Sequence, residues 1–565
     1  MNKPSSATAP RGKVGKYFIQ NGSVQFDQAK DKQLPVMMGE AYVAGFVFDH
    51  TSKTVSYAIA VIPHVHFLAP CMVRVEASTL SNQKEICGIL GERGIVICNA
   101  SHVSKYLVAS ASELGKSGPR ELVKRPGWIA GRRGYFTGSK LIAASGLDAD
   151  AYWFECSNTA VMYSRGDLDT WREQIGTLIV NNPIMLYTTC HAIASLFLAH
   201  LRLSSSIVNL VGGKGLGKTT ALQGAASVFG NAIDPAQGAQ AEDPAYISRF
   251  HGTMNGYEPL LGQYSPAPVL LDELTEASAA VTRDMCYGLT SGRAKIRLRP
   301  DGKAAYRESW QLNVITSAEE SIYELIAKIG RPMRGGEADR AIDVPVTDVG
   351  VLNCYEPFKS FNAATSHLKR ACSEQYGTPV ESIIQFCCDN PEQLGEILAM
   401  SDDIEDELLP ADCGPGERRV VKRFAAAVVA GRIAVAAGVF DQGALEKIDA
   451  AIKLVTELWW GARAGALERV RRFLEENIDK VEFGKPDLES EVVAFVDENY
   501  IVFPKDVFDR EFGEDAESML NELNGLNALK QEQKGRHVHR FRNGQFRGYA
   551  LFSKRVWPEM NQRAA

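Results

Sequence analysis

The stretch of sequence with the clearest chemistry is a glycine-rich loop. Residues 212–219, GGKGLGKT, fit the phosphate-binding pattern G-x-x-x-x-G-K-[ST] without a mismatch. An apolar, β-rich run precedes them and a helix-forming run follows, so the sequence predicts a strand, a loop and a helix. Glycines let backbone N–H groups turn around phosphates, and the helix N-terminus adds a positive end. A chance glycine loop is disfavoured because every fixed position and both flanks fit.

Each residue of this loop has an expected role. Lys218 should reach the β- and γ-phosphates of ATP, and the Thr219 hydroxyl should bind Mg²⁺. The expected nucleotide contacts are Gly212, Gly213, Lys214, Gly215, Leu216, Gly217, Lys218, Thr219 and Thr220.

Two adjacent carboxylates, Asp272 and Glu273, follow the apolar run 268–271. At the tip of a buried parallel strand, Asp272 would bind Mg²⁺ through water, and Glu273 would polarise the water that attacks the γ-phosphate. Such a pair is common by itself, and an exposed Asp-Glu at a strand end is the alternative. Its position about 55 residues beyond a complete glycine loop favours the catalytic interpretation.

Polar groups near the next two predicted strands could complete the chemistry. The apolar run 310–315 ends in Thr316-Ser317, and either hydroxyl could sense the γ-phosphate. Arg340 directly precedes the strand 341–346. It could stabilise charge on the nucleotide of a neighbouring subunit, as an arginine finger does, or form a local salt bridge. Arg331 and Arg334 are the next candidates for the finger.

A cationic segment lies between these elements. Residues 294–299, AKIRLR, alternate apolar and basic residues, and a Pro-Asp-Gly turn signal follows. The pattern predicts a hairpin over 294–307 with Ala294, Ile296 and Leu298 on the core. Its other face would present Lys295, Arg297, Arg299 and Lys303 to single-stranded DNA. The alternative is a solvated edge hairpin whose charges deter aggregation.

Length and composition predict a multidomain α/β protein. The 565 residues are 45% hydrophobic and carry a net charge of −6, so any nucleic-acid surface must be local. Eleven cysteines without a C-x-x-C pair indicate reduced thiols in a cytoplasmic protein. The sequence has no run of about 18 apolar residues, so no membrane span is expected.

The expected regions are a disordered tail over 1–16, an N-terminal α+β domain over 17–160, an ATPase core over 161–355, a helical lid over 356–484 and a winged-helix domain over 485–565. The lid should include a helix over 417–439, from which Arg419 and Arg423 would reach the nucleotide, and a second helix over 465–477. The last domain should contain three short helices over 487–530 and a hairpin over 534–554. Its DNA-binding cations would be Lys534, Arg536, Arg540 and Arg542, with Lys530 and Arg547 nearby. A winged helix that binds protein is the alternative.

Taken together, these features resemble the AAA+ helicases of bacterial mobile elements, namely phage satellites, pathogenicity islands and staphylococcal cassettes. The resemblance covers about residues 100–560, and the residues that carry it are Gly127-Trp128, Trp171, Asn181-Asn182, Thr253-x-Asn255-Gly256, Leu271-Asp272-Glu273, Tyr287-x-Leu289, Gly292, Arg340-x-x-Asp343-x-Pro345, Arg423-Phe424 and Gly431. The sequence departs from the family at Ser317-Ala318-Glu319, where the family has Ser/Thr-Gly-Glu.

The resemblance implies an MCM-like homohexamer in the bacterial cytoplasm that uses ATP and Mg²⁺ to unwind DNA during replication of the element. Its partners would be DNA and an initiator, primase or polymerase. A non-translocating AAA+ initiator or switch is the second hypothesis, and a defence ATPase with a sensor domain is the third. A cationic hairpin within the core favours the helicase, because a translocating ring needs loops that grip DNA.

Overall fold

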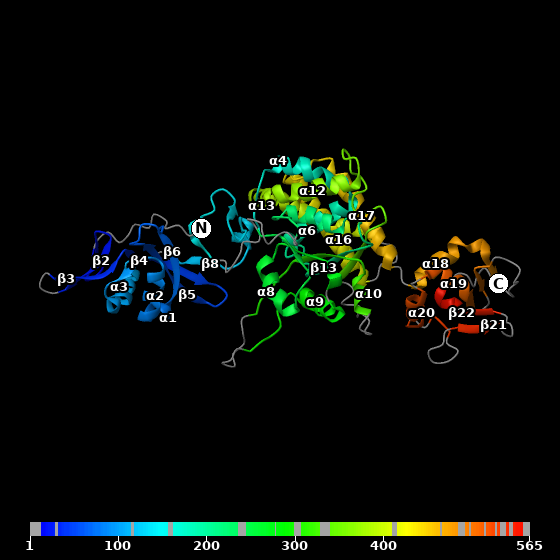
Figure 1. The fold of residues 1–565 in the computed structure, drawn as a ribbon, viewed down its shortest axis with the longest axis horizontal. Coiled ribbons are helices and arrows are strands. Elements are labelled where there is room, and N and C mark those ends of the chain that lie inside the picture. Colours follow the sequence, from blue (N-terminus) through cyan, green and yellow to red (C-terminus); the bar gives the residue numbers. More distant parts are fainter. Residues whose placement is uncertain are drawn as a thin grey trace. The chain divides into compact units, whose positions relative to one another are not determined.

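The computed structural model describes a multidomain α/β chain with five sheets and many helices. It divides into two compact units, Met1–Val455 and Thr456–Ala565, which we describe separately (Figure 1). The described residues are 13–28, 32–114, 118–155, 162–234, 244–276, 278–298, 307–327, 340–409, 415–463, 466–483, 492–496, 499–513, 516–525, 528–530, 538–541 and 546–557.

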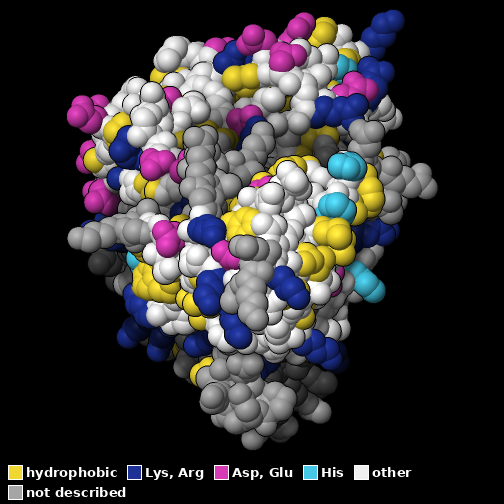
Figure 2. Space-filling view, turned by 90° about the vertical axis from the view of Figure 1, so that its left-hand side faces the viewer, with side chains coloured by type: hydrophobic (Ala, Val, Ile, Leu, Met, Phe, Trp, Pro, Cys, Tyr) yellow, Lys and Arg dark blue, Asp and Glu magenta, His cyan; other side chains and the backbone are white. Residues whose placement is uncertain are grey.

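The first unit begins with the predicted α+β region. Two long antiparallel strands, β4 (Glu40–Asp49) and β5 (Thr54–Ile62), form the centre of a five-stranded sheet. The region also contains the helices α2 (Gln83–Glu92) and α3 (Ala100–Ser112). Lys, Arg, Asp and Glu side chains are interspersed on the face of the molecule seen in Figure 2.

A three-stranded antiparallel sheet follows, formed by β9 (Gly127–Ile129), β10 (Gly134–Phe136) and β11 (Leu141–Ala143). Trp128 anchors it, because its indole Nε1–H donates to the carbonyl of Leu196 at 3.0 Å. The Trp128 ring also meets the buried Tyr135 ring edge-on, with 4.9 Å between the centroids. This sheet lies within the region expected to be an α+β domain.

A five-stranded parallel sheet forms the centre of the first unit. Its strand order is β14-β15-β16-β13-β17. The strands are β13 (Ser206–Val211), β14 (Ile247–Arg249), β15 (Val269–Asp272), β16 (Asn313–Ala318) and β17 (Ala341–Pro345). Val211 is level with both Ala318 and Pro345, so the carboxyl ends of three strands meet at one edge of the sheet.

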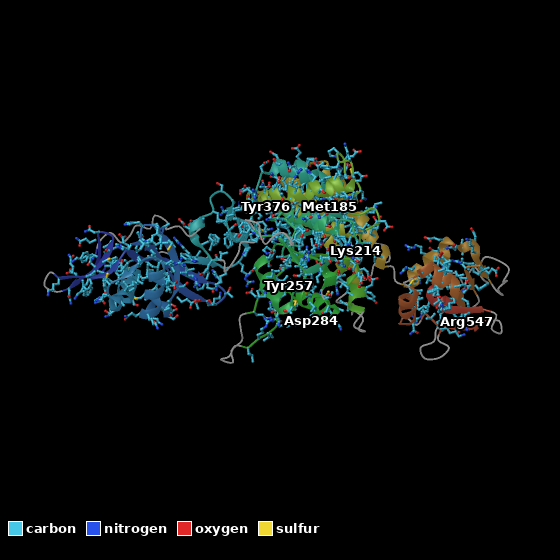
Figure 3. All side chains as sticks on the ribbon, viewed as in Figure 1. Met185, Lys214, Tyr257, Asp284, Tyr376 and Arg547 are labelled. Carbon is cyan, nitrogen blue, oxygen red and sulfur yellow. The ribbon has the colours of Figure 1, made fainter. Side chains whose placement is uncertain are left out.

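Buried helices cover this sheet. The helix α6 (Pro183–Ala194) packs between α7 (Lys218–Ser227) and α16 (Pro415–Ala436). Almost every residue of α6 is buried, including Met185, which Figure 3 labels, and this explains its apolar character on all sides. Within the described residues, no helix combines the length and apolarity needed to cross a membrane.

Two residues start helices that precede the sheet. The carboxylate of Asp167 accepts from the Thr170 N–H at 2.9 Å and caps α4 (Leu168–Trp171). Pro183 occupies the first turn of α6, where its missing N–H has no cost.

The second unit contains a five-stranded sheet of order β18-β19-β20-β22-β21. Its strands are β18 (Val481–Phe483), β19 (Ala494–Val496), β20 (Tyr500–Pro504), β21 (Val538–Phe541) and β22 (Phe546–Phe552), and its helices include α18 (Ala466–Glu476), α19 (Lys505–Phe512) and α20 (Ala516–Gly525). β21 and β22 pair antiparallel, which confirms the predicted C-terminal hairpin.

Two expectations for this region were wrong. Residues 487–530 contain two strands and two helices in their described part, instead of three helices. The helix predicted over 465–477 was assigned to the lid, yet α18 contributes Val470 and Leu474 to the apolar core of the second unit. Amphipathic periodicity predicts a helix with one buried face but does not identify the neighbour that buries it.

Candidate active site

The glycine-rich loop joins β13 to α7, as its flanking sequences predict. Gly215 and Gly217 have φ angles of +78° and +85°, in the left-handed region that glycine adopts at little cost. Space is also restricted at Gly217, because a Cβ atom there would lie 2.7 Å from Cγ2 of Val351. The loop therefore requires glycine at Gly217 for both its backbone angle and its packing.

Lys218 is the first residue of α7, and its side chain folds back over the loop. The Nζ group donates to the carbonyl oxygens of Gly212 at 2.6 Å and Gly213 at 2.7 Å. Burial lowers the pKa of the Lys218 ammonium, and three nearby carboxylates oppose that shift. These contacts hold a positive charge within the loop.

The buried carboxylate of Asp272 joins three elements at the sheet edge. Thr219 Oγ1 from α7 donates to it at 3.1–3.2 Å, and Ser317 Oγ from β16 donates at 2.5 Å. Because β16 lies between β13 and β15 in the sheet, Ser317 sits between the loop and the carboxylate pair. Thr219 and Ser317, which lie far apart in the sequence, thus both donate to the carboxylate of Asp272.

Glu273 follows at the end of β15 with an unusual backbone. Its φ angle is +63°, which is sparsely populated by residues with a side chain. The Glu273 N–H donates to Ser317 Oγ at 3.3 Å, and its exposed side chain lines the pocket. Backbone strain of this kind often occurs at functional sites, where the surrounding structure maintains it.

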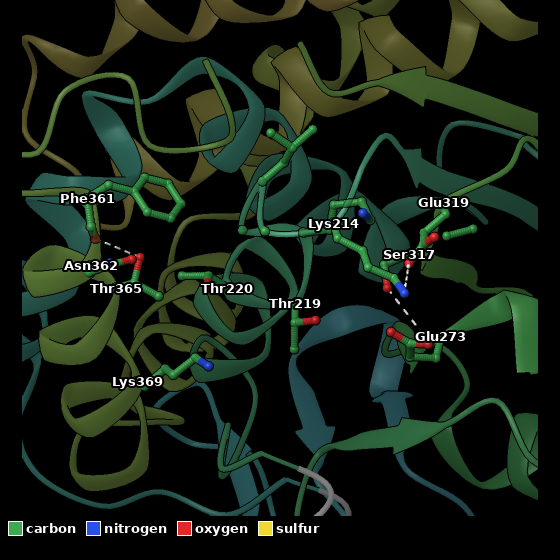
Figure 4. A pocket seen from close by; sticks show the side chains of 15 residues that line it. Lys214, Thr219, Thr220, Glu273, Ser317, Glu319, Phe361, Asn362, Thr365 and Lys369 are labelled. Carbon is green, nitrogen blue, oxygen red and sulfur yellow. Dashed lines mark hydrogen bonds and ion pairs between the residues drawn. The ribbon is translucent and has the colours of Figure 1, made fainter. Parts of the chain in front are cut away.

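Lys218, Thr219, Glu273 and Ser317 line a pocket of about 400 Å³ (Figure 4). The buried Asp272 lies behind them and contacts Thr219 and Ser317. One end holds Glu273, Ser317 and Glu319, and the other is formed by α12 (Phe361–Glu374). The four lining residues from α12 are Phe361, Asn362, Thr365 and Lys369. These four residues could not be predicted as part of the site, because nothing in a single amphipathic helix indicates that it packs beside a loop more than 140 residues earlier.

Glu319 is positioned by a network below the pocket. The half-buried Asp343 of β17 accepts from the N–H of Ile322, at 2.9 Å, at the start of α10 (Ile322–Ala327), and from Asn209 Nδ2 at 2.8 Å. Burial raises the Asp343 pKa to about 6, and these hydrogen bonds oppose the shift. These hydrogen bonds attach the segment after β16, which carries Glu319, to β13 through Asn209 and to β17 through Asp343.

The donor set fits a magnesium ion. A hydroxyl, from Thr219, and a carboxylate, from Asp272, are hard oxygen ligands of the kind that Mg²⁺ prefers, and Mg²⁺ usually completes its shell with water and substrate phosphate. Among the described residues, no group of three or more His, Cys, Asp or Glu side chains could hold a metal ion by itself. The site thus suits a cation bound together with phosphates.

The structure separates the two candidate hydroxyls on β16. Ser317 lines the pocket and contacts Asp272. Thr316 is fully buried, and its Oγ1 has no hydrogen-bond partner among the described residues. Successive side chains of a strand point to opposite faces, so only Ser317 is positioned for chemistry, and the catalytic role predicted for Thr316 is not supported.

The two lid arginines do not line the pocket. Arg423 is buried, and its guanidinium donates to the carbonyl oxygen of Ser204 at 2.6 Å and to Ser204 Oγ at 3.1 Å. Ser204 precedes β13, whereas the glycine loop follows it. Arg423 therefore lies at the amino end of β13, away from the pocket. Arg419 is exposed on α16. The predicted nucleotide contact of Arg423 was wrong because the helical pattern gives no position along the sheet.

Arg340 is exposed at the start of β17. Its carbonyl oxygen accepts from the Ile207 N–H at 2.8 Å, at the amino end of β13. At about 3.3 Å per residue, the length of β13 keeps the Arg340 backbone roughly 17 Å from its own glycine loop. The Arg340 side chain is therefore too far away to reach the pocket of its own chain. Arg331 and Arg334 lie outside the described residues.

The cationic segment differs from the predicted hairpin. Ala294 is buried as expected, but Ile296 and Leu298 are 76% and 72% exposed. A bridge pairs Arg293 with Ser309, Leu298 is also a bridge residue, and residues 294–297 between them belong to no strand. The alternation of a continuous strand therefore does not apply to residues 294–297. The expected packing of Ile296 and Leu298 on the core was wrong, and Arg299 and Lys303 lie outside the described residues.

The basic residues of this segment contact acidic residues of the same chain. Arg297 Nη2 lies 2.5 Å from Glu258 Oε2 on α8 (Met254–Tyr264), and the Lys295 backbone N–H donates to Glu258 Oε1 at 2.9 Å. Lys295 Nζ is 3.7 Å from Asp284 on α9 (Ala279–Ser291), which Figure 3 labels. Glu258 therefore fixes the segment to α8.

Part of the predicted basic surface lies in the second unit. Arg540 on β21 is level with the exposed Arg547 on β22. Lys534, Arg536 and Arg542 lie outside the described residues, as does the Arg540 side chain.

Comparisons with known proteins agree with this organisation. Residues 67–309 match a family described as "Domain of unknown function (DUF927)", and this range includes the glycine loop and the Asp272-Glu273 pair. No curated protein matches significantly. A solved structure described as "SCCmec type IV Cch - active helicase" is similar with a TM-score of 0.62 and 15% identity, over 96% of this chain and 98% of that chain. At this identity, the likeness shows a shared fold.

Proposed function

We propose that this protein is an ATP-dependent DNA helicase of a bacterial mobile element, with an AAA+ core, a helical lid and a C-terminal winged helix. One observation carries the proposal: Lys218, Thr219, Glu273 and Ser317 line one pocket at a sheet edge, and Asp272 accepts hydrogen bonds from two of them, Thr219 and Ser317. A fold shared over 96% of the chain with a structure described as an active helicase supports it.

Hydrolysis would follow from the positions of these side chains. Lys218 and the loop N–H groups bind the β- and γ-phosphates, and Glu273 accepts a proton from the attacking water. The water oxygen bonds to the γ-phosphorus as the bond to the β-phosphate oxygen breaks, releasing ADP and phosphate. Thr219 and Asp272 would hold Mg²⁺, which when bound neutralises charge on the phosphates. Ser317 orients Asp272 and the Glu273 backbone.

A ring of subunits would complete the site. Arg340 lies at the opposite end of the sheet from its own loop and is exposed, so a trans role requires a neighbouring copy. We propose a homohexamer in which Arg340 of one subunit stabilises charge on the nucleotide bound by the next. DNA would pass through the ring, and the C-terminal hairpin with Arg540 and Arg547 would contact the duplex backbone.

One observation favours the second candidate, a non-translocating AAA+ initiator or switch. Arg297, which was expected to contact DNA, is paired with Glu258 and Asn255 in the same chain. A motor requires cations that are available to phosphates in its channel. The two candidates differ in whether DNA accelerates ATP hydrolysis through this segment.

ATPase assays on the full chain, with and without single-stranded DNA, test the proposal. We expect Mg²⁺-dependent hydrolysis that DNA stimulates and that Glu273→Gln abolishes while ATP binding persists. Hydrolysis at the wild-type rate by Glu273→Gln would exclude the role given to this carboxylate. Hydrolysis that is indifferent to DNA would favour the switch.

A further inference from the structure

The pocket continues from the glycine loop onto one face of α12. Phe361, Asn362, Thr365 and Lys369 line it, and a helix brings positions about four residues apart onto the same face. Thr365 Oγ1 donates to the Phe361 carbonyl oxygen at 2.9 Å. In Figure 4, these side chains lie on the side of the pocket opposite Glu273 and Ser317, with Thr220 between the two groups.

The chain between β17 and α12 is attached to the glycine loop. The Val346 N–H donates to the Val211 carbonyl oxygen at 2.7 Å, and the Val351 N–H donates to the Leu216 carbonyl oxygen at 2.9 Å. The Phe361 ring closes this contact, since a Cβ atom on Gly217 would lie 3.2 Å from its Cζ. The face of α12 therefore has a fixed position relative to the loop.

Lys369 contributes a cation that the loop chemistry does not use. Its side chain is exposed at the pocket, and no carboxylate of the described residues forms an ion pair with it. Asn362 and Thr365 add polar groups beside it. An unpaired ammonium with neighbouring hydrogen-bonding groups at one end of a phosphate pocket suits a charged and hydroxylated part of a ligand.

We propose that α12 is the subsite for the nucleoside end of the bound nucleotide. The inference rests on the proposed function, because Glu273 then fixes the γ-phosphate at the opposite end of the pocket. The chain of phosphates runs from there along the loop, past Thr220, toward α12. Lys369 pairs with the α-phosphate, and Asn362 and Thr365 lie beside the sugar.

Calorimetric titration of the full chain with ATP and with ADP in Mg²⁺ tests this assignment. A charge-assisted contact to the α-phosphate is present in both ligands, so Lys369→Ala should weaken both affinities by the same factor, about ten- to a hundredfold. Lys369→Arg should restore most of the affinity. Arg370→Ala is the matched control, because Arg370 is the next residue of α12, is exposed and does not line the pocket.

The outcomes separate the inference from the proposed function. If the wild type binds both nucleotides and Lys369→Ala leaves both affinities unchanged, the subsite is wrong and the ATPase proposal stands. A loss confined to ATP would place Lys369 at the γ-phosphate and reverse the proposed orientation. If the wild type binds neither ATP nor ADP, the proposed function fails, and the subsite fails with it.

Discussion

The glycine-loop pocket and the cationic segment, described over residues 294–298, are two regions whose structures agree with prediction to different degrees. In the pocket, Lys218, Thr219 and Asp272 lie together as their motifs predict. In the segment, the two outer apolar residues point to solvent and Arg297 is paired within the chain. The difference shows which kinds of sequence pattern specify geometry.

The motif of the pocket specifies backbone conformation directly. Left-handed glycines, a strand end and a helix start fix where each side chain must lie. The alternation of the cationic segment specifies faces only if a neighbouring strand pairs with it. Residues 294–297 belong to no strand, so a different interaction, the contact with Glu258, determines the position of the segment.

Glu258 illustrates why that contact could not be predicted. Its side chain is only 2% exposed, and a buried carboxylate needs a partner to offset its lost hydration. Glu258 lies in the middle of α8, nearly 40 residues before Arg297, and nothing in the sequence joins the two. Arg297, which was predicted to contact DNA, instead forms an ion pair with the buried Glu258.

The largest effect should come from Lys218→Ala. Loss of the main cation should reduce ATP hydrolysis to background and weaken ATP binding more than ADP binding. Lys214→Ala is the matched control in the same loop, because the Lys214 side chain is 86% exposed and lies 3.6 Å from Glu319 at the surface. Turnover and nucleotide affinity are measured for both variants. Equal losses in the two would contradict the specific role given to Lys218.

Arg340→Ala should have the next largest effect, a loss of about 10³–10⁵-fold in turnover with nucleotide binding nearly intact, since fingers of this kind act on transition-state charge. Mixing Arg340→Ala with Lys218→Ala subunits should restore part of the activity, because some interfaces then combine an intact loop with an intact finger. If confirmed mixed rings remain inactive at every ratio, the trans assignment is wrong.

Ser317→Ala should reduce turnover by about ten- to a hundredfold, because the Asp272 carboxylate and the Glu273 N–H each lose a hydrogen bond. Thr316→Val is the matched control on the adjacent residue. Its Oγ1 has no partner among the described residues, so turnover should remain close to wild type. A larger effect at Thr316 than at Ser317 would reverse the assignment made from the structure.

Arg297→Ala should act first on stability. Removing the partner of a buried carboxylate typically costs about 3 kcal/mol or more, and the partial exposure of Arg297 places this case at the lower end. Thermal unfolding at neutral pH measures the loss, and Glu258→Gln combined with Arg297→Ala should recover part of it.

The exposed apolar residues of the same segment should contribute the least. Ile296→Ala and Leu298→Ala should change the free energy of unfolding by no more than about 0.5 kcal/mol, because neither side chain is buried. A loss of several kcal/mol in either variant would restore the predicted packing of the segment on the core.

Much of the fold could be predicted from the sequence. Sequence patterns locate the strand and helix that flank the glycine loop, the strand that ends at Asp272 and the C-terminal hairpin. The neighbours of helices could not be predicted, since an apolar stripe fits any apolar surface. For this reason α18 was assigned to the wrong unit and Arg423 to the wrong end of β13.

The candidate site divides in the same way. Its loop and its carboxylate pair come from contiguous motifs, and both are present in the pocket. The α12 residues of the site, including Lys369, could not be predicted, because no local sequence pattern shows that α12 packs beside the glycine loop. The choice between Thr316 and Ser317 required the strand register, which only the assembled sheet provides.

Unwinding of a forked DNA by the purified full chain tests the central claim most directly. The account predicts strand separation that requires ATP and Mg²⁺ and disappears in both Lys218→Ala and Glu273→Gln, with Lys214→Ala remaining active. ATP hydrolysis without any strand separation would contradict the helicase and leave the switch. Strand separation that persists in Lys218→Ala would contradict the claim that this pocket drives the reaction.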